Sequence, residues 1–217
     1  TELQGALGEL SSLQILTDSL RAQAHEAANK LHTVITMVEM GKPDDAVRFA
    51  TEELALSQRL VDRLSHDVGE PALVALLLGK TAQADERGIA LTITEDTHLP
   101  ADTDVPLSAQ EMITVLGNLI DNAMDACDRD DPWVEVTVSL ERTELLMRVA
   151  DSGSGMAGEA FERAMQRGYS TKTDTEPGQH GLGLALVAQV VRRHGGTLTA
   201  DVTYGSVVTV LVPGGDA

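Results

Sequence analysis

The segment from residue 111 to residue 127 constrains the fold of this chain most, because it is strongly amphipathic and carries two asparagines on its polar side. At 3.6 residues per turn, Asn118 and Asn122 share one face with Glu111 and Asp125. The opposite face is apolar and consists of Met112, Leu116, Leu119, Ile120, Ala123 and Cys127. Asparagine is a mediocre helix former, since its side chain competes for backbone hydrogen bonds. The pair therefore indicates either a solvated helix face or a binding site.

Two glycine clusters follow this predicted helix. Residues 149–156 read VADSGSGM and come after a predicted strand over 144–150, and residues 178–187 read GQHGLGLALV and lead into an apolar helical stretch. Glycine lets the backbone approach a ligand closely, and a helix start presents unpaired N–H groups to anions. Each cluster alone is weak evidence, because strand-ending Asp-Gly turns and loop-to-helix junctions are common. Their order after an asparagine-bearing helix is rare by chance, and it indicates nucleotide binding.

In these motifs the chain resembles the ATP-binding domain shared by sensor histidine kinases, gyrase-type ATPases, Hsp90 chaperones and mismatch-repair ATPases. The resemblance implies that Asn122 ligates Mg²⁺, that Asn118 lines the phosphate side of ATP, and that Asp151 accepts a hydrogen bond from the adenine amino group. One amide oxygen on a rigid helix suits Mg²⁺, which also takes phosphate oxygens and water. The resemblance also implies backbone positions that shape the pocket or close on the phosphates: Gly153, Gly155, Gly181, Leu182 and Gly183.

Residues 152–180 are expected to form the lid over ATP, with a short helix over 159–166 that carries Phe161. Lys172 either meets the phosphates as a mobile point charge or is a solvent-facing loop lysine. One departure from the family concerns residues 205–209, which read GSVVT where many relatives have a Gly-Thr-Thr run. The adenine contact of that run is therefore assigned neither to Ser206 nor to Thr209.

A long helical pattern opens the chain. Apolar residues recur with gaps of three and four at positions 13, 16, 20, 24, 27, 31, 34 and 38, which is typical of a bundle seam. Gly41 and Pro43 end this helix and start a second one. One such hairpin is too thin to bury its own seam. Two copies are therefore predicted to pair as a four-helix bundle in a homodimer.

His25 lies beside the seam, so it is expected to be partly accessible to solvent. Glu26 follows it directly, and Asn29 lies one turn later on the same face. A lone histidine here is usually a polar flank of the seam, but residues 25–32 (HEAANKLH) resemble the phosphoacceptor box of the citrate and dicarboxylate sensor kinases, a branch of the two-component histidine kinases. The resemblance implies that His25 is phosphorylated, that Glu26 acts as base, and that Asn29 orients a water in a reverse, phosphatase reaction.

The predicted fold class is α+β in two domains. Residues 1–68 form the signalling helix with the dimerisation and phosphotransfer hairpin, and residues 69–217 form the ATP-binding domain. The second domain is expected to be a two-layer α/β sandwich, with helices on one face of a mostly antiparallel sheet. A helix is predicted over 70–88, and strands are predicted over 89–94, 133–140, 144–150, 196–202 and 206–212.

Charge and composition limit the kinds of molecule that the chain can bind. The net charge of −18 argues against nucleic acid and anionic membrane surfaces but not against ATP, whose phosphates are met by Mg²⁺ and N–H groups. Cys127 is the only cysteine, so no disulfide can form within the chain, which suits the cytosol. No apolar run near 18 residues and no signal peptide are visible. Because this branch carries a membrane-bound sensing region upstream, the chain is expected to be the cytoplasmic part of a longer receptor.

The expected activity is transfer of the ATP γ-phosphate to Nε2 of His25 and then to an aspartate in the receiver domain of a response regulator. Three alternatives remain. An anti-sigma-type serine/threonine kinase shares the ATP domain but needs no His-Glu-x-x-Asn hairpin. A non-catalytic phosphotransfer dimer would not bind nucleotide, and a gyrase- or chaperone-type ATPase would hydrolyse ATP without a phospho-enzyme.

Overall fold

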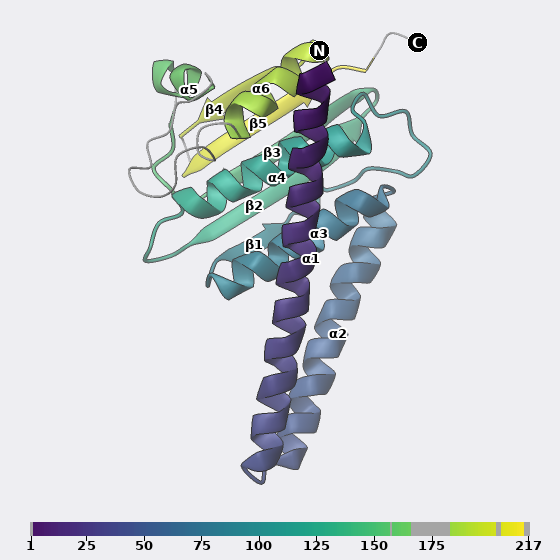
Figure 1. The fold of residues 1–217 in the computed structure, drawn as a ribbon, viewed down its shortest axis with the longest axis vertical. Helices are drawn as coiled ribbons and strands as arrows, with labels where there is room; N and C mark the ends of the chain where they lie inside the picture. The colour runs from purple at the N-terminus through teal and green to yellow at the C-terminus, as the bar shows by residue number, and fades with distance from the viewer. Residues whose placement is uncertain (1, 157, 166–182, 203–204, 215–217) are drawn as a thin grey trace.

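The computed structural model describes residues 2–156, 158–165, 183–202 and 205–214 (Figure 1). Its N-terminal part is a hairpin of two long helices, α1 (Glu2–Glu39) and α2 (Pro43–Asp67). Gly41 adopts a φ of 75° between them, a conformation that residues with a side chain rarely take. Pro43 begins α2, where a backbone N–H has no partner inside the helix anyway. The predicted hairpin and its break are confirmed.

The rest of the chain is a two-layer α/β sandwich. Its elements are α3 (Pro71–Glu86), β1 (Ala90–Ile93), α4 (Ala109–Ala126), β2 (Trp133–Glu141), β3 (Glu144–Asp151), α5 (Glu159–Ala164), α6 (Gly183–Arg193), β4 (Thr197–Asp201) and β5 (Ser206–Val212). The strands run in the order β1-β2-β3-β5-β4, with β1 parallel to β2 and the other pairs antiparallel. Helices α3, α4 and α6 cover one face of this sheet (Figure 1). The predicted fold class is confirmed, and the strand limits agree within one or two residues.

Helix α4 forms where the amphipathic pattern placed it. A capping box starts it: the Ser108 hydroxyl accepts the N–H of Glu111, and the Glu111 carboxylate accepts the N–H of Ser108. The predicted apolar face is buried against the sheet, as the low exposure of Leu116, Leu119 and Ile120 shows. This packing aims the opposite, polar face of α4 away from the core.

The N-terminal half of α1 lies across α3 and α4 (Figure 1). Two glycines allow this close crossing. A Cβ on Gly79 of α3 would overlap the side chain of Ser19, and one on Gly117 of α4 would lie 2.7 Å from Cγ2 of Ile15. Glycine in a helix costs about 1 kcal/mol relative to alanine, so both positions favour contact with α1 over helix stability.

Polar contacts join the same helices. The Gln110 side chain donates to the Ser12 hydroxyl at 2.9 Å, and the Gln23 side chain donates to the carbonyl of Ala75 at 3.4 Å. The hydroxyl of Ser19 is buried and has no hydrogen-bond partner among the described residues. Helix α1 therefore has a packing face, which includes residues 12, 15, 19 and 22, in addition to the predicted seam.

The seam itself remains uncovered within one chain. Large apolar side chains are exposed along both helices of the hairpin, including Leu13, Leu20, Leu31, Val38, Leu54, Leu56 and Val61. A row of exposed large apolar side chains of this kind marks an interaction site. No helix among the described residues is both long enough and apolar enough to cross a membrane.

Candidate nucleotide and phosphoacceptor sites

The asparagines of α4 lie where α6 begins. The amide group of Asn118 donates to the carbonyl of Thr114 at 2.6 Å, which turns its oxygen toward Gly183, the first residue of α6. An ideal Cβ on Gly183 would lie 2.6 Å from that oxygen, so only glycine fits here without a shift. Asn122 lies one turn further along α4 and is exposed. The structure thus brings Asn118 together with the second glycine cluster and leaves the amide of Asn122 accessible.

Asp151 is the last residue of β3 and is only 3% exposed. Burial raises the pKa of its carboxyl group, although hydrogen bonds from the Gly153 N–H (2.8 Å) and the Ser206 side chain offset part of this effect. A buried, oriented carboxylate with few protein donors can accept a further hydrogen bond from a ligand. Ser206 lies directly opposite Asp151 in the β3–β5 pairing. The strand register therefore brings to the site a residue that the sequence left unassigned.

The first glycine cluster closes the space between β3 and α4. A Cβ on Gly153 would overlap the carbonyl of Ala126 at the end of α4. Gly155 has a φ of 64°, and a Cβ there would lie 2.8 Å from that of Ser206. Both glycines are therefore needed for the backbone to pass between α4 and β5 beside Asp151.

Other predicted site residues fall outside the described part of the chain. Lys172, Gly181 and Leu182 belong to the segment 166–182, as does His180. The short helix α5 precedes this segment, and its Phe161 is buried.

His25 lies on α1 with 68% of its side chain exposed, as expected for a residue beside the seam. Its Nδ1 is 3.1 Å from Oε1 of Glu86, at the end of α3, and 3.2 Å from the side-chain amide of Asn29. A carboxylate can only accept, so Nδ1 carries the proton when it binds Glu86. The Asn29 atom near Nδ1 is the amide nitrogen Nδ2, which can only donate, so Asn29 binds the ring only when Nδ1 is unprotonated and Nε2 carries the proton. Glu86 and Asn29 thus compete for Nδ1 and favour opposite tautomers. Nε2 has a free lone pair in the tautomer that binds Glu86.

Glu26 faces a different partner. Its carboxylate pairs with Lys30, which also binds Glu53 of α2 at 2.8 Å. Burial alone would lower the pKa of Lys30, but the two carboxylates more than offset this effect and raise it. Of the two hairpin residues predicted to assist His25, Asn29 thus contacts the ring, whereas Glu26 links α1 to α2.

The end of α3 connects His25 to the C-terminal end of α4, which carries Asn122. Arg87 follows Glu86 and donates to Oδ1 of Asp125 at 2.8 Å and to the carbonyl of Met124 at 3.1 Å. Asp125 lies one turn beyond Asn122 on α4. No local pattern predicts this connection, because Glu86 and Arg87 resemble any charged helix end.

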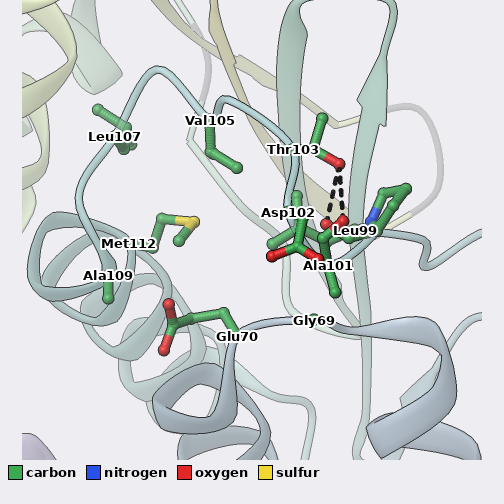
Figure 2. Close-up of a pocket in the computed structure, with 11 residues that line it drawn as sticks. Gly69, Glu70, Leu99, Ala101, Asp102, Thr103, Val105, Leu107, Ala109 and Met112 are labelled. Carbon is green, nitrogen blue, oxygen red and sulfur yellow. Dashed lines mark hydrogen bonds between the residues drawn. The ribbon is translucent and has the colours of Figure 1, made fainter.

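A separate hollow lies at the start of α4. It has a volume of about 250 Å³ and is lined by residues from the start of α3, the loop 99–107 and the first turn of α4 (Figure 2). Met112 borders it, whereas Asn122 lies near the opposite end of α4. This hollow therefore lies apart from the candidate nucleotide site.

Residues 108–216 match the family described as histidine kinase-, DNA gyrase B- and HSP90-like ATPase. This stretch includes α4 and both glycine clusters, and the chain belongs to this ATPase family.

Two curated relatives match almost the whole chain. The sensor protein CitS of Bacillus subtilis is 35% identical over 98% of this chain and 39% of its own length. A probable C4-dicarboxylate sensor kinase of Halalkalibacterium halodurans is 28% identical over 94% of this chain and 39% of its own length. The chain thus spans about two fifths of the relatives it matches. The predicted resemblance to sensor histidine kinases of the citrate and dicarboxylate branch is confirmed.

A solved structure also supports the fold. Full-length ShkA in complex with AMPPNP superposes with a TM-score of 0.56 at 19% identity, covering 100% of this chain and 46% of that one.

Proposed function

We propose that this chain is the kinase core of a two-component sensor histidine kinase. The ATP domain transfers the γ-phosphoryl group of ATP to Nε2 of His25, from which it passes to an aspartate of a response regulator. The observation that carries the proposal is the placement of an exposed histidine against the end of α3 in an ATPase-family domain.

ATP is proposed to bind at the end of the sandwich where α4, β3 and α6 meet. Asp151 would accept the adenine amino group, with Ser206 beside it. Asn118 would line the phosphates, and Gly153 and Gly155 would shape the pocket wall. The backbone at Gly181, Leu182 and Gly183 would close on the phosphates, and Lys172 would meet them as a point charge. The exposed amide oxygen of Asn122 fits Mg²⁺, which would neutralise charge on the phosphates when bound.

The phosphoryl step needs positioning more than covalent chemistry from the protein. The lone pair of Nε2 forms the bond to the γ-phosphorus, the bond from that phosphorus to the bridging oxygen breaks, and ADP leaves. Glu26 is proposed as a base for the ring and Asn29 as the residue that orients water in a reverse phosphatase reaction. The contact of Asn29 with the ring supports its assignment.

We also propose the division into a phosphotransfer hairpin (1–68) and an ATP domain (69–217), and a homodimer formed through the exposed seam. A four-helix bundle from two hairpins would cover the apolar side chains that one chain leaves exposed. The response regulator is the proposed partner in solution. We further propose that the chain is the cytoplasmic part of a longer, membrane-anchored receptor; its coverage of only 39% of CitS supports the greater length alone.

The test is incubation with γ-labelled ATP and Mg²⁺, using the parent chain, His25→Gln, Asn122→Ala and His32→Gln. His32 lies two turns after His25 on the same helix and is the matched control. Acid-labile, alkali-stable label in the parent and in His32→Gln, but in neither other variant, supports histidine kinase activity. Label that survives His25→Gln would point to a serine/threonine kinase, and free phosphate without label would point to an ATPase.

A further inference from the structure

The carboxylate that the structure places on His25 comes from the ATP domain and not from the hairpin. Oε1 of Glu86 lies 3.1 Å from Nδ1, and the glutamate side chain is 32% exposed against 68% for the histidine. Glu86 is the last residue of α3. The contact therefore depends on how α3 crosses α1.

Two sets of contacts hold the end of α3 in place. On one side, Arg87 is tied to Asp125 and to the carbonyl of Met124 on α4. On the other side, Ser19 of α1 packs on Gly79 of α3, where no larger residue fits. Glu86 is thus carried on a segment fixed between the histidine helix and the asparagine helix.

Glu26, the carboxylate adjacent to His25 in sequence, is engaged elsewhere. It pairs with Lys30, and Lys30 bridges to Glu53 of α2. These two carboxylates keep the lysine charged, and the lysine in turn attracts Glu26 away from the ring. Moving Glu26 to the imidazole would break this bridge, whereas Oε1 of Glu86 already lies within hydrogen-bonding distance of Nδ1 and can hold the proton there against the donor Nδ2 of Asn29.

Resting on the proposed kinase function, we propose that Glu86 is the positioning residue for His25. Its carboxylate accepts the Nδ1 proton in a hydrogen bond and so keeps the ring in the tautomer whose Nε2 lone pair is free. As the Nε2–phosphorus bond forms and ADP leaves, the ring gains positive charge. Glu86 then stabilises this charge through the same hydrogen bond, and transfer of the Nδ1 proton to the proposed base, Glu26, leaves a neutral phosphohistidine.

The experiment measures the tautomer of His25 and the rate of autophosphorylation separately. The chain is labelled with ¹⁵N-histidine, and the ring nitrogens of His25 are followed by long-range ¹H–¹⁵N correlation, with His25→Gln for assignment. Autophosphorylation rates are measured over a range of ATP concentrations. The variants are Glu86→Ala, Glu86→Gln, Glu26→Ala and, as a control for charge on the hairpin, the exposed Glu52→Ala.

In the parent chain we expect Nδ1 to carry the proton. Glu86→Ala should lose this preference and slow phosphorylation at saturating ATP about tenfold or more, while the KM for ATP stays unchanged. Glu86→Gln keeps an acceptor without the charge, so it should retain the tautomer and lose only part of the rate. Glu26→Ala and Glu52→Ala should keep the tautomer of the parent.

The positioning role of Glu86 is refuted if Glu86→Ala keeps the tautomer and the phosphorylation rate of the parent. It is also refuted if Glu26→Ala loses both the parental tautomer and the parental rate. If Glu86→Ala fails to fold, it will also fail to bind ATP. The tautomer and rate of Glu86→Gln then test the role of Glu86. A parent chain that takes no label on His25 refutes the proposed function itself. A labelled parent together with an unaffected Glu86→Ala refutes only the assignment of Glu86.

Discussion

Lys80 of α3 and Asp121 of α4 form an ion pair of 2.5 Å in which the two partners differ greatly in exposure. The lysine side chain is 2% exposed, and the aspartate side chain is 40% exposed. The Lys80 ammonium also donates to the side chain of Gln83 at 3.0 Å. Because Asp121 lies directly before Asn122, this pair fixes the asparagine helix against α3.

The unequal burial predicts unequal costs of breaking the pair. Asp121→Asn leaves a buried ammonium without its counter-charge, and it should lower the free energy of unfolding by about 3–5 kcal/mol. Lys80→Met leaves a carboxylate that water can reach and fills the buried space, so its cost should be less than half as large. Urea unfolding of both variants measures the difference. Equal costs, or a larger one for Lys80→Met, would contradict the burial of Lys80.

The crossing of α1 over α3 can be tested at Gly79. Gly79→Ala places a Cβ against Ser19, and overpacking of this kind costs about 1–3 kcal/mol. Gly8→Ala is the matched control, because a Cβ there meets no atom within 4 Å and should stabilise α1 by about 1 kcal/mol. Hydrogen exchange of residues 12–22 should increase in Gly79→Ala only. If both variants behave alike, α1 does not pack on α3 in solution.

Asp151 should make stability depend on pH in a recognisable direction. Burial raises its pKa in the folded state above the ordinary value of 3.8, so ionisation favours the unfolded chain. The parent should therefore lose stability relative to Asp151→Asn as pH rises from about 3.8 through the raised pKa, and the difference should then stay constant. Urea unfolding from pH 4 upward measures this trend.

The same substitution should weaken nucleotide binding at neutral pH. Replacing a charge-assisted hydrogen bond to adenine costs about 1.5–3 kcal/mol, which is roughly a tenfold to hundredfold loss of affinity for ATP. Calorimetry with ATP measures this change. A variant that binds ATP as tightly as the parent would remove Asp151 from the proposed site.

Glu111 should show the opposite pH dependence. Burial alone would raise its pKa, but hydrogen bonds from His194 (2.9 Å) and from the backbone and hydroxyl of Ser108 more than offset this and lower it. Its stabilising effect is therefore present above the ordinary value of 4.5 and lost as pH falls through the lowered pKa.

Glu111→Gln should accordingly cost about 1 kcal/mol at neutral pH and nothing at the acid end of the range. Glu135→Gln, on an exposed position of β2, controls for the loss of one negative charge. Thermal unfolding at several pH values measures both. A cost for Glu111→Gln that does not change with pH would show that Glu111 acts through packing alone.

Local pattern was enough to predict most elements of the fold. The 3.6-residue period predicted both faces of α4, and alternation predicted the strands closely, because these signals come from neighbours along the chain. The contacts of Glu86, Ser206 and Lys80 are made with residues that are distant in the sequence. They depend on strand register and on the angle between helices, which no single segment encodes. Only Lys80 carried a local sign, as a lone cation in the otherwise apolar stretch of α3.

The prediction for α1 was incomplete for the same reason. Its seam was recognised from the spacing of large apolar residues, whereas its packing face contains Ser12, Ser19 and Ala22 beside Ile15. Small residues give little signal in a hydrophobic pattern, although they permit close helix contact when glycines lie opposite. The signal that could have revealed this face was the pair of mid-helix glycines, Gly79 and Gly117.

The buried hydroxyl of Ser19 makes the contact between α1 and α3 easier to separate than an apolar contact of the same shape. While the helices are joined, this hydroxyl has no hydrogen-bond partner in the described part of the chain, which costs about 1–3 kcal/mol, and separation returns it to water. Ser19→Ala should remove that cost and hold the two helices together more firmly. The serine thus favours a reversible contact between α1 and the ATP domain over a permanent one.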